Sequence, residues 1–110
     1  MPYDAELAER VRAAVPSGIE VQQRKMFGGL AFLRNGHYAV GAYKDGGLMI
    51  RCSADHWQAF VSEKGASPKL RQGGPVSGWV LVEASAVRTD RSLKKWVKRG
   101  LDFAGEQPPK

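Results

Sequence analysis

The sequence holds few of the residues from which catalytic and metal sites are usually built. Its 110 residues include one cysteine, Cys52, and two histidines. A single cysteine cannot form an internal disulfide, which is consistent with a reducing cytoplasm. A metal site needs three or four His, Cys, Asp or Glu ligands at close spacing, and the sequence shows no such cluster. We therefore expect neither a metal nor another cofactor.

Long apolar runs and export signals are also missing from the sequence. No apolar run exceeds five residues, whereas a helix that spans a bilayer needs roughly 18. The first six residues are acidic and lack the apolar centre of a secretory signal. We expect a cytoplasmic protein without membrane contact. The hydrophobic fraction of 43% and the charged fraction of 25% are ordinary for a globular chain, so residues 1–110 are expected to form one domain.

Charge is the clearest bias in the composition. The formal net charge is +6. Residues 1–66 contain eight Lys and Arg against seven Asp and Glu, while residues 67–110 contain nine against four. The excess of positive charge therefore lies in the C-terminal part of the sequence, and it favours an anionic partner.

The hydrophobic periodicity predicts an α+β domain. Apolar residues recur at helical spacing in residues 4–15, after Ser53 and again after Thr89. Runs typical of strands cover residues 19–27, 30–34, 37–43, 48–52 and 78–83, with one short edge strand around residues 69–71. This order favours an antiparallel sheet with helices packed on it. The consecutive apolar residues of 78–83 predict a central strand with both faces covered.

Two glycine-containing segments are expected to shape the sheet. Asn35-Gly36 predicts a two-residue hairpin turn, because both residues tolerate a positive φ. Gly28 or Gly29 is expected to form a bulge that bends the first strand, while Phe27 is anchored in the core.

One pair of side chains suggests catalysis. Cys52 and His56 are four residues apart, and an imidazole can take a proton from a nearby thiol. Cysteine is, however, among the most often buried residues, and Cys52 ends a predicted strand. His37 follows a hairpin turn and is expected to make surface hydrogen bonds. We prefer the structural interpretation and expect no enzymatic activity.

The last predicted helix has a basic face. At 100° per residue, five cations lie opposite its apolar stripe: Arg91, Lys94, Lys95, Lys98 and Arg99. Such a face can contact phosphates, so a nucleic-acid-binding module is one interpretation. A solvated helix of a basic protein shows the same pattern, and the three tryptophans that could stack on single strands are expected in the core.

A second basic candidate lies in the first predicted strand. Residues 22–25 are all polar, which makes them more solvent-facing than folding alone requires. Arg24 and Lys25 are therefore candidates for contact with a protein partner.

Several short motifs follow one another along the chain in a distinctive order. The first is Lys25-Met26-Phe27-Gly28-Gly29, followed by Phe32, Asn35-Gly36, Asp45, Leu48 and Arg51. The others are an initial Tyr3-Asp4 with Leu7, then Gly78-Trp79-Val80-Leu81-Val82, and finally Leu93, Trp96 and Pro108-Pro109-Lys110. Together they resemble the TfoX N-terminal domain, which is found in TfoX/Sxy regulators of bacterial competence and in many short stand-alone proteins. The resemblance covers nearly the whole chain.

The resemblance implies the order α-β-β-β-α-β-β-α, like that of secretion-chaperone-type domains. It also implies a regulator of the transcription of DNA-uptake genes, with no catalytic residues to map onto this chain. We therefore expect a non-enzymatic regulatory or adaptor domain that binds an unidentified protein partner, with homodimerisation through a sheet face or edge as one mode. The alternative is the nucleic-acid-binding module that uses the basic last helix.

Overall fold

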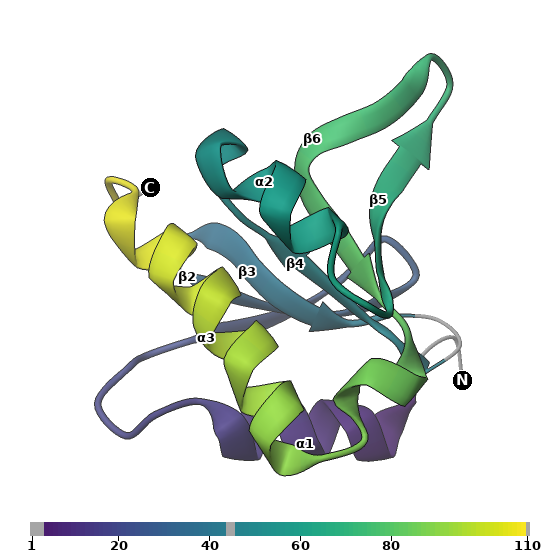
Figure 1. The fold of residues 1–110 in the computed structure, drawn as a ribbon. Coiled ribbons are helices and arrows are strands. Elements are labelled where there is room, and N and C mark those ends of the chain that lie inside the picture. The colour runs from purple at the N-terminus through teal and green to yellow at the C-terminus, as the bar shows by residue number, and fades with distance from the viewer. Residues whose placement is uncertain (1–3, 44–45, 110) are drawn as a thin grey trace.

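The computed structural model describes residues 4–43 and 46–109, which form three α-helices and six strands. In chain order they are α1 (Ala5–Ala14), β1 (Gln22–Met26), β2 (Gly29–Arg34), β3 (His37–Ala42), β4 (Leu48–Arg51), α2 (Ala54–Val61), β5 (Ala66–Arg71), β6 (Gly74–Val82), a short 3-10 helix η2 (Ala84–Val87) and α3 (Asp90–Glu106) (Figure 1). The α+β class is confirmed. Four strands precede α2, whereas the expected order has three. The additional strand is β1, which pairs with β2 in a hairpin of its own.

The six strands form one antiparallel sheet in the order β1-β2-β3-β4-β6-β5. The short edge strand expected around residues 69–71 is confirmed as part of β5. The strand expected at 78–83 is β6, which pairs on both sides but is covered by helices on one face only. Val80 and Val82 are buried against the helices, whereas Trp79 and Leu81 on the other face stay partly exposed.

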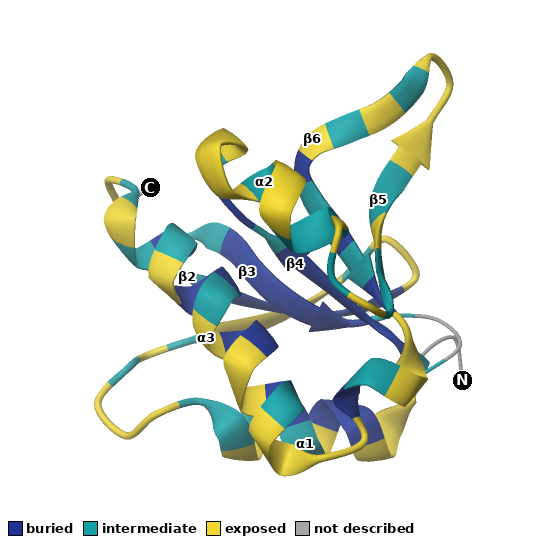
Figure 2. Ribbon diagram, viewed as in Figure 1, coloured by how far each residue is buried: buried dark blue, intermediate teal, exposed yellow. Residues whose placement is uncertain are grey.

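The core fills the space between the sheet and the helices (Figures 1 and 2). Asp4 starts α1, where its carboxylate accepts hydrogen bonds from the backbone N–H groups of Glu6 and Leu7 at 2.9 and 3.2 Å. The stripe of α1 buries Leu7, Ala8 and Val11. The stripe of α3 buries Leu93, Trp96, Val97, Leu101 and Ala104. Helices therefore cover a single face of the sheet, and the apolar periodicity of the sequence determines which side of each helix is buried.

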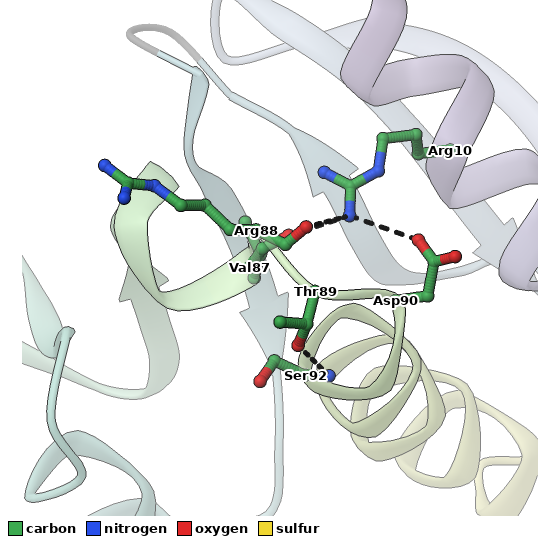
Figure 3. Close-up of polar contacts among 6 residues, drawn as sticks. All are labelled: Arg10, Val87, Arg88, Thr89, Asp90 and Ser92. Atoms are coloured by element: carbon green, nitrogen blue, oxygen red, sulfur yellow. Dashed lines mark hydrogen bonds and ion pairs between the residues drawn. The ribbon is translucent and has the colours of Figure 1, made fainter.

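Arg10 links α1 to the start of α3 (Figure 3). Its Nη2 donates to the carbonyl oxygens of Val87 and Arg88 at 2.9 and 3.1 Å, and it lies 3.4 Å from a carboxylate oxygen of Asp90. The same junction is capped by Thr89, whose hydroxyl accepts from the backbone N–H of Ser92 at 3.1 Å. These bonds hold two helices that are far apart in the sequence on the same side of the sheet.

The turn between β1 and β2 and the turn between β2 and β3 have similar backbone angles. Asn35 and Gly36 have φ values of 57° and 81°, which confirms the predicted turn. Phe27 and Gly28 have φ values of 53° and 76°, and Met26 pairs directly with Gly29. The expected bulge and the expected core position of Phe27 are therefore wrong. Because the hairpin closes at Met26, Phe27 falls in the turn itself and its side chain is 48% exposed.

No helix in the described ranges is long and apolar enough to cross a membrane.

Candidate functional site

The sheet face opposite the helices carries a second, smaller apolar cluster, formed by side chains of the strands and the segments next to them. Its buried residues are Ala31, Leu33, Tyr38 and Met49, and the side chains packed on them are those of Met26, Tyr43, Trp79 and Leu81. We call this side the helix-free face. Its strand positions follow from the register, since paired residues of adjacent antiparallel strands lie on the same face.

The strand register places the two candidate partner-binding residues, Arg24 and Lys25, on different faces of the sheet. Arg24 pairs with Ala31 and therefore lies on the helix-free face, whereas Lys25 pairs with Leu30 and lies on the helix-covered face. Both side chains are exposed, because β1 is an edge strand. The two cations thus flank one sheet edge from opposite sides and do not form a single patch.

Three aromatic rings meet over the helix-free face. The ring centroids of Phe27 and Tyr38 are 6.0 Å apart, those of Phe27 and Trp79 are 5.8 Å apart, and those of Tyr38 and Trp79 are 4.9 Å apart. The buried Tyr38 hydroxyl donates to the carbonyl of Met49 at 3.1 Å. Burial raises the pKa of Tyr38 far above its usual range, so this donor keeps its proton at physiological pH.

A lysine from the opposite edge of the sheet lies on this aromatic cluster. The Nζ of Lys69 is 4.1 Å from the ring centroid of Phe27 and 5.3 Å from that of Trp79, within the range of a cation–π interaction. Phe27 follows β1 and Lys69 belongs to β5, and these strands are the two edges of the sheet. The sheet therefore curls, and its edges approach each other over the helix-free face.

The strands are charged with one sign only. The six strands contain six of the 17 Lys and Arg residues and none of the 11 Asp and Glu residues, so the cations elsewhere equal the acidic residues in number. The six are Arg24, Lys25, Arg34, Arg51, Lys69 and Arg71. The five ion pairs within residues 4–43 and 46–109 all join other residues. The strand cations are thus left without a carboxylate partner in this part of the chain.

The basic residues of α3 are mostly engaged within the molecule. Glu63 accepts from Lys95 at 3.0 Å and pairs with Arg99 at 2.7 Å, and Asp102 pairs with Lys98 at 2.6 Å. Arg99 also lies over the rings of Phe60 and Trp96, at 4.2 and 4.6 Å. Of the five predicted phosphate contacts, Arg91 and Lys94 are exposed and make no ion pair among the described residues.

Cys52 and His56 line one pocket of about 180 Å³ together with Phe103 and Asp102. The thiol is buried, at 3% exposure, and His56 Nδ1 lies 3.0 Å from the Ser53 hydroxyl. Burial raises the pKa of Cys52 to about 11, although nearby Arg99 lowers it. The cysteine is therefore a protonated thiol rather than an activated nucleophile.

We expect Cys52 to react slowly with thiol reagents in the folded protein. At pH 8, raising the thiol pKa from 9.0 to about 11 lowers the thiolate fraction about 100-fold. Alkylation by iodoacetamide should therefore be at least about 100-fold slower in the native protein than in urea. Equal rates in both conditions would contradict a buried thiol, and a native rate above the unfolded one would restore the nucleophile interpretation.

Residues 4–43 and 46–109 contain no group of three or more His, Cys, Asp or Glu side chains that could hold a metal ion.

A comparison with protein families gives a match that covers most of the chain. The model of the TfoX N-terminal domain matches residues 16–104. The chain belongs to the TfoX N-terminal domain family. The matched region contains the whole sheet and nearly all of α3. Comparisons with curated proteins and with solved structures gave no match.

Three residues of this TfoX N-terminal domain stand out only in the structure. Sequence reasoning assigned Phe27 and Trp79 to the core and did not place Lys69 beside them. The exposed position of Phe27 has a signal in the sequence, because Phe27-Gly28 lies between two strand-like runs as Asn35-Gly36 does. The contact between Phe27 and Lys69 depends on the curl of the sheet, which no local pattern shows.

Proposed function

We propose that this TfoX N-terminal domain is a non-enzymatic regulatory domain that binds another protein through the helix-free face and the adjoining edge of the sheet at β1. The observation that carries the proposal is the exposed Phe27, which lies beside Trp79 on a sheet whose charged side chains are all cationic and make no ion pair with the described residues. A cluster of aromatic side chains that is partly exposed and surrounded by polar groups is typical of a protein-binding surface.

The backbone at Phe27 supports the same interpretation. A left-handed φ is unfavourable for a residue with a side chain, by roughly 1 kcal/mol, and turns of this form prefer Asn, Asp or Gly. Strained residues of this kind concentrate at functional positions. A phenylalanine that is both strained and half exposed contributes less to folding than Asn would at this turn, which favours a role in binding.

The charges of β1 favour a different protein as the partner over a second copy. Pairing two β1 strands edge to edge would bring the Arg24 and Lys25 side chains of one copy close to those of the other. Like charges opposite each other destabilise a strand pair, and charged edge strands commonly prevent such pairing. We therefore propose a heterologous partner. The family suggests regulation of transcription or competence as its setting.

Charge reversal tests the proposed surface. In a native bacterial lysate, Arg24→Glu/Lys25→Glu should lose the protein captured by the unmodified domain, because it reverses the charge at the sheet edge. The matched control is Arg91→Glu/Lys94→Glu, which changes the net charge equally on exposed, unpaired residues of α3. Retention by both variants, or loss by the control alone, would contradict a partner site on the sheet.

The alternative nucleic-acid function is tested with the same variants. Arg91 and Lys94 favour this alternative, because both are exposed and make no ion pair with the described residues. Fluorescence anisotropy with duplex DNA and single-stranded RNA across a salt series would show binding near 0.15 M salt that the α3 variant abolishes. We expect weak binding that vanishes by that salt concentration.

A further inference from the structure

The Lys69 ammonium lies on an aromatic surface instead of beside a carboxylate. It makes cation–π contacts with Phe27 and Trp79 and has no ion pair or hydrogen bond among the described residues. Partial burial, together with the neighbouring charge of Arg71, lowers the pKa of Lys69. An ammonium has three donors, and here they lack a protein acceptor. A carboxylate from outside would supply that acceptor in a partly desolvated place, where charge-assisted hydrogen bonds are strong.

An apolar contact lies directly beside this cation. Phe27 and Leu70 are the two large apolar side chains that the described residues leave exposed, at 48% and 67%. Leu70 follows Lys69 in β5, and the end of the β5–β6 hairpin projects from the body of the domain (Figures 1 and 2). A ligand at the Lys69 ammonium therefore meets both its charge and the exposed Phe27 ring beside it.

The position of Lys69 favours a peptide over a single-stranded nucleic acid. Bases bind to sheets by stacking on open ring faces. The ammonium of Lys69 lies 4.1 Å from the Phe27 ring centroid, Trp79 packs against Phe27 edge to face, and Tyr38 is buried. The cluster thus presents an ammonium on rings, which suits a carboxylate, and a half-exposed Phe27, which suits an apolar side chain.

We infer that Lys69 and Phe27 form the centre of a binding site for an acidic segment of the partner protein. An Asp or Glu carboxylate of that segment accepts from the Lys69 ammonium, and an adjacent apolar or aromatic side chain packs on Phe27. The unpaired strand cations Arg24 and Arg71 attract the same segment and speed its approach. This inference rests on the proposed protein-binding function and adds the chemistry of the partner.

The test uses a fluorescein-labelled random copolymer of glutamate and tyrosine, with polyglutamate and single-stranded poly(U) as comparison probes. Binding to the full chain is followed by fluorescence anisotropy at about 0.15 M salt, where surface charges more than roughly 8 Å apart are screened. We expect the copolymer to bind more tightly than polyglutamate, because only the copolymer fills the contact on Phe27. Lys69→Gln and Phe27→Asn should each weaken its binding about tenfold.

Two variants keep this experiment interpretable. Phe27→Asn places a residue preferred by this turn at the same position, so the hairpin is retained while the ring is removed. Lys94→Gln removes one unpaired cation from α3 and should change binding less than twofold. All variants are first compared by circular dichroism and thermal unfolding.

Each outcome separates the inference from the function on which it rests. Copolymer binding that is absent, or that is unchanged in Lys69→Gln and Phe27→Asn, overturns the acidic-segment site. Poly(U) binding that is tighter and depends on the same two residues replaces it with a nucleic-acid site. If the copolymer fails while lysate capture still depends on Arg24 and Lys25, the protein-binding function stands and only the proposed partner chemistry is wrong.

Discussion

Trp96→Ala should lower the free energy of unfolding by about 4 kcal/mol, the usual cost of removing a fully buried tryptophan. Trp96 is 1% exposed and lies in the core cluster between the helices and the sheet. Its ring meets Phe60 of α2 edge to face at 6.1 Å, and the Arg99 guanidinium lies 4.6 Å from its centroid. The substitution therefore removes core volume and the main aromatic contact between α2 and α3.

The measurement is urea unfolding followed by far-ultraviolet circular dichroism, since the change removes a fluorophore. Because 4 kcal/mol is a large share of the stability of a small domain, Trp96→Ala could fail to fold at all. Trp96→Phe keeps an aromatic ring at the site and should cost about 1–2 kcal/mol, which remains measurable. A loss below about 1 kcal/mol for Trp96→Ala would contradict the packing of α3.

Gly100→Ala should lower the free energy of unfolding by about 3 kcal/mol, despite the roughly 1 kcal/mol that alanine normally adds within a helix. Gly100 lies on the buried side of α3, against the backbone of β3. An added Cβ would clash with the Ala39 carbonyl oxygen and lie 2.8 Å from its carbon. Backbone of a central strand cannot move aside as a side chain can, so the helix must shift outward.

Gly105→Ala is the matched control in the same helix. A Cβ at Gly105 would meet the end of the Arg34 side chain, with its Cζ 2.6 Å away. Arg34 can move at the loss of its hydrogen bond to the Leu101 carbonyl, 3.1 Å long, so the change in unfolding free energy should stay within about 1 kcal/mol. Equal effects of the two substitutions in urea unfolding would contradict the close approach of α3 to β3.

Local signals in the sequence predicted the helices and most strands well. Asp4 and Thr89 cap α1 and α3 at the positions where the helical periodicity begins, and Asn35-Gly36 forms the expected hairpin turn. These features depend on hydrogen bonds and backbone preferences within a few residues, so neighbouring residues suffice to determine them. The buried stripe of α3 likewise follows from its 3.6-residue period.

Phe27 shows where the same reasoning failed. Its assignment to the core assumed an unbroken strand over residues 19–27, in which Phe27 shares a side with Ile19 and Val21. The strand covers only Gln22–Met26, and pairing of Met26 with Gly29 leaves Phe27 in the turn. The position at which a hairpin closes is decided by cross-strand pairing, and a change of one residue reverses the side on which each residue lies.

The candidate site was predicted in part. The exposure of Arg24 and Lys25 followed from their polar neighbours, and their adjacency in a strand already puts them on opposite faces. Only the strand register shows which of the two lies on the helix-free face. The five cations of α3 share a helix face by periodicity, yet Glu63, which lies just after α2, forms ion pairs with two of them. Ion pairs between distant segments require the tertiary arrangement, which one sequence does not contain as a local pattern.

The sequence by itself determined the α+β class, the family, the capped helices and the single unpaired cysteine, because composition, periodicity and short motifs suffice for each. The tertiary structure alone decided that β6 lies between β4 and β5, that the sheet edges curl together, and that Lys69 reaches Phe27. It also showed that the six strand cations lack carboxylate partners within the described residues. These properties arise from pairing and packing between segments far apart in the chain, where long-range contacts outweigh local preference.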